Sequence, residues 1–311
     1  MMKRRICIAA IAAIALSIAR APARAADAPC SLVLLATLPL ETHPRGNVSV
    51  PASVNGKPVT LAVDTGSFIS ALGFSTATSL QLPLNARAGL GSYENDVPVL
   101  FYVQTDTFQL GPTSGNGLQF FVVPSHFLGP GVSGLLGPDI MKNFDIELDF
   151  AGGKFNLFAP NTCPAPPVYW THEPFAEVAM KLDRDWKVVV PALLDGRPVT
   201  VILDTGASRS LMSFSQAQGL FGWQEGDPNL KRLNIDINGR PASVYRYRFS
   251  TLTFDVIEVA YPDIDMAQGK NFDDHGRDDA QIVLGMSVLR QLHPYIAYKA
   301  QKLYLTAAEA R

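Results

Sequence analysis

The sequence predicts an all-β, bilobal protein in which one fold occurs twice. Residues 54–67 (VNGKPVTLAVDTGS) and residues 194–207 (LDGRPVTVILDTGA) are identical at seven of fourteen positions, at an offset of 140. Later landmarks keep the same order, since residues 108–110 match 252–254 and residues 136–137 match 284–285, at offsets of 144 and 148. The 24 glycines and 23 prolines fall in short turn-like groups, which favours many short strands over long helices.

The composition excludes two classes of protein. Hydrophobic residues make up 47% of the 311 residues, which excludes a disordered chain. Lys and Arg number 26 against 28 Asp and Glu, so the net charge is −2. No basic surface is therefore expected, and we expect no nucleic-acid partner.

The first 25 residues are predicted to be a Sec-type signal peptide. Lys3, Arg4 and Arg5 precede an apolar stretch over residues 6–19, and Ala23-Arg24-Ala25 fits a cleavage site. The apolar stretch is shorter than the roughly 20 residues of a membrane span. We therefore expect a periplasmic or secreted protein with no stable membrane insertion after cleavage, and a retained anchor is the alternative.

The repeat predicts the domain boundaries. The N-terminal lobe is assigned to residues 26–160, a Pro-rich linker to 161–168 and the C-terminal lobe to 169–311, because four prolines crowd residues 159–167 and disfavour strand pairing there. Both lobes lie in one chain, so we expect a monomer.

The elements follow the repeat. Strands are predicted at 58–63 and 198–203, each after a two-residue hairpin signal, Asn55-Gly56 and Asp195-Gly196. Alternating patterns predict further strands at 105–110 and 245–254. Short helices are expected at 75–80, 138–143, 213–220 and 287–292.

Each copy carries Asp-Thr-Gly directly after an apolar strand, with the catalytic candidates Asp64 and Asp204. Two equivalent turns related by a pseudo-twofold axis would bring the two carboxylates face to face. Like charges at that distance cannot both ionise, so the pair shares one proton. The ionised carboxylate can then deprotonate a water while the protonated one polarises a carbonyl.

The residues around each aspartate suit this arrangement. Gly66 and Gly206 allow close approach to the carboxylates. Thr65 and Thr205 offer hydroxyls that could lock the two turns together. Downstream, the patterns at residues 135–137 (LLG) and 283–285 (VLG) repeat, and their glycines, Gly137 and Gly285, could support the turns from behind or form an ordinary strand-to-helix turn.

These motifs are similar to those of aspartic peptidases of the retropepsin and pepsin type, and the chain most resembles the bacterial retropepsin-like proteins. The resemblance covers nearly all of residues 45–308. It implies two β-barrel-like lobes with an active-site cleft between them, and an endopeptidase that hydrolyses a peptide or protein substrate with water as the nucleophile. It also implies Asp64 and Asp204 as the catalytic pair, Thr65 and Thr205 as interlocking residues, and no metal or other cofactor.

The chain departs from the family pattern at two places. Pepsin-like enzymes carry Ser or Thr after each Asp-Thr-Gly, bonded to the outer carboxylate oxygen, but here Ser67 is matched by Ala207. Asp204 should then be the more easily protonated member. The glycine-rich flap tip of retroviral enzymes is missing, and the candidate flap residues are Tyr93, Asn95, Asn238 and Gly239.

Three alternatives stay open. The chain could be a non-catalytic peptide-binding or inhibitor-like protein that keeps the cleft. Cys30 and Cys163 could form a disulfide in an oxidising compartment, or remain thiols. Six aspartates between residues 263 and 279 could form a cation site, but their spacing misses a calcium loop and a solvated acidic loop is expected instead.

Overall fold

The computed structural model divides the chain into residues 1–30 and residues 31–311, and only the second unit is described below. Within it the structure describes residues 31–308 except 45, 87–91, 94–96, 99, 162, 238–239 and 268–279. The predicted signal peptide therefore lies outside the described residues. No helix of the described part is both long and apolar enough to cross a membrane.

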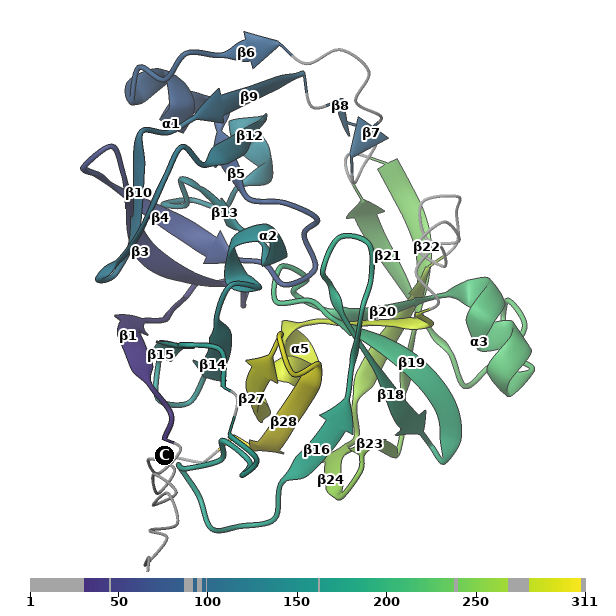
Figure 1. Ribbon diagram of the computed structural model, residues 1–311. Coiled ribbons are helices and arrows are strands. Elements are labelled where there is room, and N and C mark those ends of the chain that lie inside the picture. The colour runs from purple at the N-terminus through teal and green to yellow at the C-terminus, as the bar shows by residue number, and fades with distance from the viewer. Residues whose placement is uncertain are drawn as a thin grey trace, which may run out of the picture. The chain divides into compact units, whose positions relative to one another are not determined.

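Two ten-stranded sheets dominate the described chain (Figure 1). The strands of the first sheet are β2 (Glu41–Thr42), β3 (Val48–Val54), β4 (Lys57–Val63), β5 (Ala71–Gly73), β6 (Asn85–Ala86), β9 (Phe101–Gln104), β10 (Thr107–Leu110), β11 (Thr113–Asn116), β12 (Gln119–Val123) and β13 (Gly134–Leu136). The strands of the second are β17 (Lys181–Leu182), β18 (Val188–Leu194), β19 (Arg197–Leu203), β20 (Ser210–Ser213), β21 (Lys231–Ile237), β22 (Arg240–Arg248), β23 (Thr251–Phe254), β24 (Ile257–Ala260), β25 (Asp263–Ala267) and β26 (Ile282–Leu284).

The two sheets have the same strand order. The first runs β11-β10-β3-β4-β13-β5-β12-β9-β6, with β2 paired to β3. The second runs β24-β23-β18-β19-β26-β20-β25-β22-β21, with β17 paired to β18. Every strand occupies the place of its repeat partner, so the predicted all-β, bilobal fold class is confirmed.

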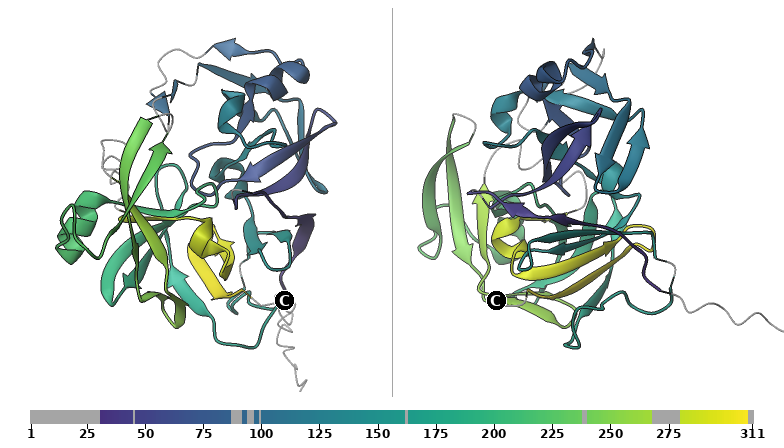
Figure 2. Two further views of the ribbon diagram at one scale, coloured as in Figure 1. Left: turned by 180° about the vertical axis from the view of Figure 1, so that it is seen from behind. Right: turned by 90° about the vertical axis from the view of Figure 1, so that its left-hand side faces the viewer.

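A third, six-stranded sheet joins the two lobes and was not predicted. Its strands are β1 (Leu34–Pro39), β14 (Asp145–Asp149), β15 (Lys154–Phe158), β16 (Ala176–Ala179), β27 (Leu292–Ala297) and β28 (Lys302–Ala307). They lie in the order β1-β15-β14-β27-β28-β16, three from each lobe. In Figure 2 this sheet can be found by its two yellow strands, β27 and β28. The pseudo-twofold axis that relates the lobes therefore passes between β14 and β27, which pair antiparallel.

The short helices lie close to their predicted places. They are α1 (Phe74–Ser79), α2 (Pro138–Met141), α3 (Phe214–Phe221) and α5 (Met286–Leu289), with a 3₁₀ turn η2 (Ser125–Phe127). A separate two-stranded ladder, β7 (Ser92–Tyr93) with β8 (Val97–Pro98), occurs between β6 and β9 in the chain. The predicted strand over residues 245–254 was wrong in one respect, because β22 ends at Arg248 and β23 begins at Thr251.

The hairpin signals act through backbone conformation. Asn55 and Gly56 join β3 to β4 with φ values of 48° and 73°, and Asp195 and Gly196 join β18 to β19 with 46° and 75°. Positive φ at both central residues is the requirement of a tight type I′ turn, which Asn-Gly and Asp-Gly satisfy. The turns fix the register of β3–β4 and β18–β19, and β4 and β19 end directly before the two aspartates.

A buried polar cluster lies in the six-stranded sheet. Glu147 of β14 accepts hydrogen bonds from His293 Nε2 at 2.8 Å, Tyr169 Oη at 2.7 Å and Asn156 Nδ2 at 3.0 Å. The indole of Trp170 stacks on the His293 ring at 4.4 Å. The cluster therefore connects strands of both lobes with the segment that follows the Pro-rich linker.

The predicted disulfide is only partly described. Cys163 belongs to a disulfide in the structure, and Cys30 lies outside the described residues. The pairing of these two cysteines therefore stays a prediction, as do the domain boundaries at 160 and 168.

Candidate active site

The two Asp-Thr-Gly turns begin where parallel strands of each lobe end. Asp64 follows β4, and its N–H donates to Leu136 O of β13 at 3.0 Å. Asp204 follows β19, and its N–H donates to Leu284 O of β26 at the same distance. The hydrophobic-hydrophobic-Gly motifs thus contact the turns through the carbonyl groups of their leucines, whereas the sequence assigned this support to Gly137 and Gly285.

Each carboxylate is held in the same way by its own turn. Asp64 Oδ1 accepts from the N–H groups of Gly66 at 3.1 Å and Ser67 at 2.8 Å. Asp204 Oδ1 accepts from Gly206 at 2.8 Å and Ala207 at 3.0 Å. Backbone donors leave each side chain little rotational freedom, so both carboxylates are oriented before any substrate binds.

The two threonines connect the turns across the lobe boundary. Thr65 Oγ1 donates to Leu203 O at 2.8 Å and accepts from Thr205 N–H at 3.1 Å. Thr205 Oγ1 donates to Val63 O at 2.6 Å and accepts from Thr65 N–H at 3.1 Å. Both threonines are buried. The predicted interlock is confirmed, and it fixes the spacing of the two aspartates.

The glycines of the turns bring the carboxylates together. A Cβ at Gly66 would lie 2.1 Å from Asp204 Cγ, and one at Gly206 would lie 2.4 Å from Asp64 Cγ. No side chain larger than hydrogen fits at either position, since real Cβ atoms do not approach other atoms that closely. Each glycine therefore makes room for the aspartate of the opposite lobe.

Burial raises the pKa of Asp204 above its ordinary value. The hydrogen bonds from Ala207 and Gly206, the charge of Lys187 and a hydrogen bond with the Asp64 side chain act in the opposite direction but are outweighed. This direction fits Asp204 as the member that holds the shared proton. That Asp204 is more easily protonated than Asp64 remains a prediction.

The predicted role of Ser67 is corrected. Its hydroxyl donates to Ile69 O at 2.8 Å, and only its backbone N–H reaches Asp64 Oδ1. The residue therefore shapes the turn beyond Asp64. Because Ala207 supplies the same backbone contact, the Ser67–Ala207 difference does not by itself distinguish the two carboxylates.

A second layer of serines was missed from the sequence. Ser70 Oγ donates to Asp139 Oδ1 at 2.7 Å and accepts from Gly137 N–H at 2.9 Å. In the other lobe Ser210 Oγ accepts from Gly285 N–H at 3.1 Å and lies 3.4 Å from Ser287 Oγ. Both serines follow their aspartate by six residues, so the repeat itself carries the signal.

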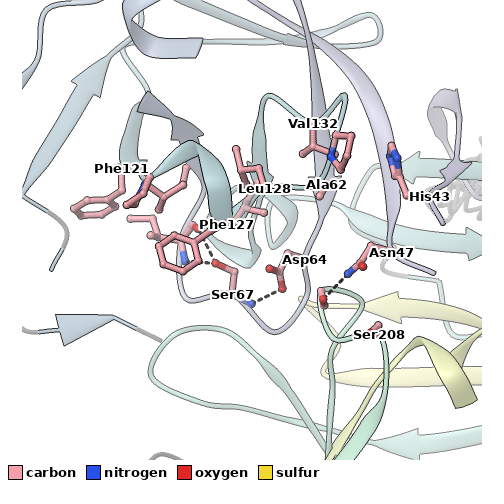
Figure 3. Close-up of a pocket in the computed structure, with 18 of the residues that line it drawn as sticks. His43, Asn47, Ala62, Asp64, Ser67, Phe121, Phe127, Leu128, Val132 and Ser208 are labelled. Carbon is pink, nitrogen blue, oxygen red and sulfur yellow. Dashed lines mark hydrogen bonds between the residues drawn. The ribbon is translucent and has the colours of Figure 1, made fainter. Parts of the chain in front are cut away.

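A pocket of about 530 Å³ opens beside Asp64 (Figure 3). Its wall is largely apolar and comes from β5, β12 and the segment around η2, with Phe68, Ala71, Phe121, Phe127 and Leu128 among the lining residues. Asn47 lies at the opposite margin in Figure 3, and its side-chain amide donates to Gly206 O. Asn47, which connects the lobes beside the carboxylates, was not predicted as a site residue.

The candidate flap residues are only partly described. Tyr93 lies in β7 opposite Val97 of β8, whereas Asn95, Asn238 and Gly239 lie outside the described residues. Ile237 and Arg240, on either side of the second candidate tip, pair across β21 and β22. Within the described ranges no group of three or more His, Cys, Asp or Glu side chains forms a metal site.

Duplicated β-lobes with two Asp-Thr-Gly turns interlocked at their junction define the class of two-lobed, aspartic protease-like proteins. A sequence model of the family described as aspartyl protease matches residues 50–140 and 190–288, which together make up more than half of the chain. The chain belongs to the aspartyl protease family.

Many solved structures match this chain, and one of them shows the shared architecture. The crystal structure of Basic 7S globulin from soybean matches 89% of this chain and 97% of its own, with a TM-score of 0.50 and 12% sequence identity. At that identity the likeness shows the architecture alone. A search of curated proteins found no match.

Proposed function

We propose that the protein is an aspartic endopeptidase that hydrolyses peptide bonds with a water activated by Asp64 and Asp204. The observation that carries the proposal is the pair of carboxylates in mutual hydrogen-bonding contact, each oriented by two backbone N–H groups. A protein that only binds peptides has no need of two carboxylates held face to face.

The proposed reaction uses one shared proton. The ionised carboxylate, assigned to Asp64, takes a proton from water as the oxygen attacks the peptide carbonyl carbon. The protonated carboxyl, assigned to Asp204, gives its proton to the carbonyl oxygen. The resulting diol then collapses as the C–N bond breaks: Asp64 gives its proton to the departing amine nitrogen, and one diol hydroxyl gives its proton to Asp204. A carboxylic acid and an amine leave, and the pair again holds one proton.

The test compares the purified protein with Asp64→Asn and Asp204→Asn on a mixed peptide library between pH 4 and pH 7, read by mass spectrometry. We expect cleavage by the wild-type protein and a loss of at least about 10³-fold in each variant, because removal of an acid or base of a concerted pair removes most of the acceleration. Asp255→Asn is the matched control, since Asp255 is exposed in the β23–β24 turn with φ of 51°, a conformation that Asn adopts readily.

The outcomes separate the two functions. Cleavage that survives in either dyad variant would contradict the proposed mechanism. Peptide binding without any cleavage would favour the peptide-binding or inhibitor-like alternative.

We also propose that the protein is exported as a monomer and that Cys30 pairs with Cys163. The charged and apolar pattern of residues 3–25 supports export, and the disulfide-bonded state of Cys163 supports an oxidising compartment. Cell fractionation with N-terminal sequencing tests the cleavage after Ala25. Peptide mapping of the unreduced protein tests the cysteine pairing.

A further inference from the structure

The wall of the apolar pocket has a counterpart in the other lobe. In lobe one, Phe121 of β12 lies opposite Ala71 of β5 and Tyr102 of β9. Phe121 also contacts Phe68, with ring centroids 6.1 Å apart. Phe68, Ile69 and Tyr102 pack against Ala71 and Phe121 in one apolar cluster.

The same positions of lobe two carry charges. In the matching sheet, Asp265 of β25 takes the place of Phe121, since it lies opposite Leu211 of β20 and Arg246 of β22. Arg246 therefore replaces Tyr102. Arg209 replaces Ile69, because both follow their catalytic aspartate by five residues. We call Arg209, Arg246 and Asp265 the guanidinium cluster.

Hydrogen bonds hold the guanidinium cluster in a defined geometry. Arg246 donates from Nε to Asp265 Oδ1 at 2.6 Å and from Nη2 to Oδ2 at 2.9 Å. Arg209 Nη1 donates to Asp265 Oδ2 at 3.3 Å. The Asp265 side chain is only 4% exposed, while that of Arg209 is 52% exposed. A buried carboxylate thus holds two guanidinium groups in place, and one of them faces solvent.

The sequence expectation for this region was wrong at two positions. Asp263 and Asp265 were assigned to a solvated acidic loop, but they lie in β25 and pair with Arg248 and Arg246. Asp263 and Asp265 alternate along a strand, as do Arg246 and Arg248 on the neighbouring strand. This spacing indicates paired strands, whereas the count of aspartates indicated a loop. The other four aspartates of that segment lie outside the described residues.

The charge of the cluster determines what it can recognise. Two guanidinium groups against one carboxylate leave a net charge of +1. Both oxygens of Asp265 already accept hydrogen bonds from arginine, and its side chain is only 4% exposed, so its carboxylate is not accessible to a basic side chain of a ligand. Lys187 adds a further positive charge on this side, acting on Asp204. A carboxylate is the complementary partner, because guanidinium binds it through paired N–H donors.

We propose that the two lobes bind chemically different side chains on the two sides of the cleaved bond: a large apolar or aromatic residue in the pocket beside Asp64, and an aspartate or glutamate against Arg209 beside Asp204. This inference rests on the proposed peptidase function. An extended peptide that crosses the pseudo-twofold axis at the carboxylates places its flanking residues on opposite lobes, so the difference between the lobes becomes a sequence preference.

The experiment has two stages. Cleavage sites from a peptide library are first aligned to show whether Asp and Glu are enriched on one side of the bond. Matched peptides that differ only by Glu or Gln at that position then give a ratio of kcat/KM. We expect a ratio of about fivefold to tenfold in favour of Glu in the wild-type protein at low salt. The ratio should shrink as ionic strength rises.

Variants connect the preference to the cluster. Arg209→Gln should bring the Glu/Gln ratio close to one while cleavage of the Gln peptide continues, which also shows that the variant is folded. Arg209→Lys keeps the charge and should retain part of the ratio. Arg248→Gln is the matched control, because it removes an exposed guanidinium that pairs with Asp263 one step along the same ladder, and its ratio should stay at the wild-type value.

The outcomes are distinct from those of the functional test. A peptidase that depends on both catalytic aspartates but shows no Glu preference, or keeps that preference in Arg209→Gln, would overturn this inference and leave the proposed function intact. Absence of cleavage of every peptide by the wild-type protein would instead contradict the proposed function itself.

Discussion

The state of protonation of two side chains decides what the site can do. Asp64 and Asp204 are held alike by backbone donors, yet catalysis requires one to be ionised while the other keeps a proton. Burial raises the pKa of Asp204, so its proton is retained at pH values where an ordinary aspartic acid has lost it.

The pH dependence of kcat/KM follows from that shift. Activity should rise with pH as the first proton leaves the pair, and should fall again as the raised pKa of Asp204 is passed. We therefore expect a bell-shaped profile with its maximum in the acidic range. A peptide assay at constant ionic strength checks this, and undiminished activity at pH 9 would refute the shared proton.

At the scale of elements, the site is a junction of two strand–turn units. Each turn is supported by a parallel neighbour, β13 or β26, and each is tied to the opposite turn by a threonine. The threonine hydroxyls replace backbone partners that the tight turns cannot supply themselves. The hydroxyls therefore fix the relative position of the two lobes and also stabilise the folded protein.

Thr65→Val should lower the free energy of unfolding by about 2 kcal/mol, because it leaves Leu203 O without its donor and Thr205 N–H without its acceptor in a buried place. Thr65→Ser restores the hydroxyl and should recover most of the loss. Denaturant unfolding of the three proteins measures the effect. A loss in the Ser variant with none in the Val variant would show that packing of the methyl group, rather than the hydrogen bonds, stabilises the junction.

Local elements were predictable from the sequence, and long-range pairings were not. The hairpins at Asn55-Gly56 and Asp195-Gly196 depend on residues that are adjacent in the chain, so their backbone preferences are readable directly. The antiparallel pairing of Asp145 with Ala297 joins distant segments. No local pattern specifies it. The candidate pair Asp64 and Asp204 was found because the repeat compares two copies, and Asn47 was missed because its repeat counterpart is Lys187.

At the scale of the whole molecule, the six-stranded sheet holds the lobes together through Glu147. Burial by itself would raise the pKa of Glu147, but hydrogen bonds from His293, Tyr169 and Asn156 together hold it below the ordinary value. A carboxyl with a lowered pKa in the folded state stabilises the protein above its unfolded pKa, near 4.5. That contribution is lost as the pH falls through the folded value.

Glu147→Gln should therefore lower the free energy of unfolding at pH 7 by about 1–3 kcal/mol, and the difference from wild type should narrow below pH 4.5. Glu177→Gln is the control, because Glu177 pairs with Lys302 at the exposed edge of the same sheet. Chemical unfolding at several pH values measures both. A difference that does not change with pH would show that shape, and not charge, explains the role of Glu147.

The lobes meet edge to edge between β14 and β27, so each half of the chain behaves like one subunit of a symmetric dimer whose two copies have been joined. A dimer of identical chains must present the same surface on both sides of its axis, and every substitution appears twice. Here each half of the chain has its own sequence. Phe121 and Asp265 can therefore differ at the same structural position, and the two sides of the site present different chemistry.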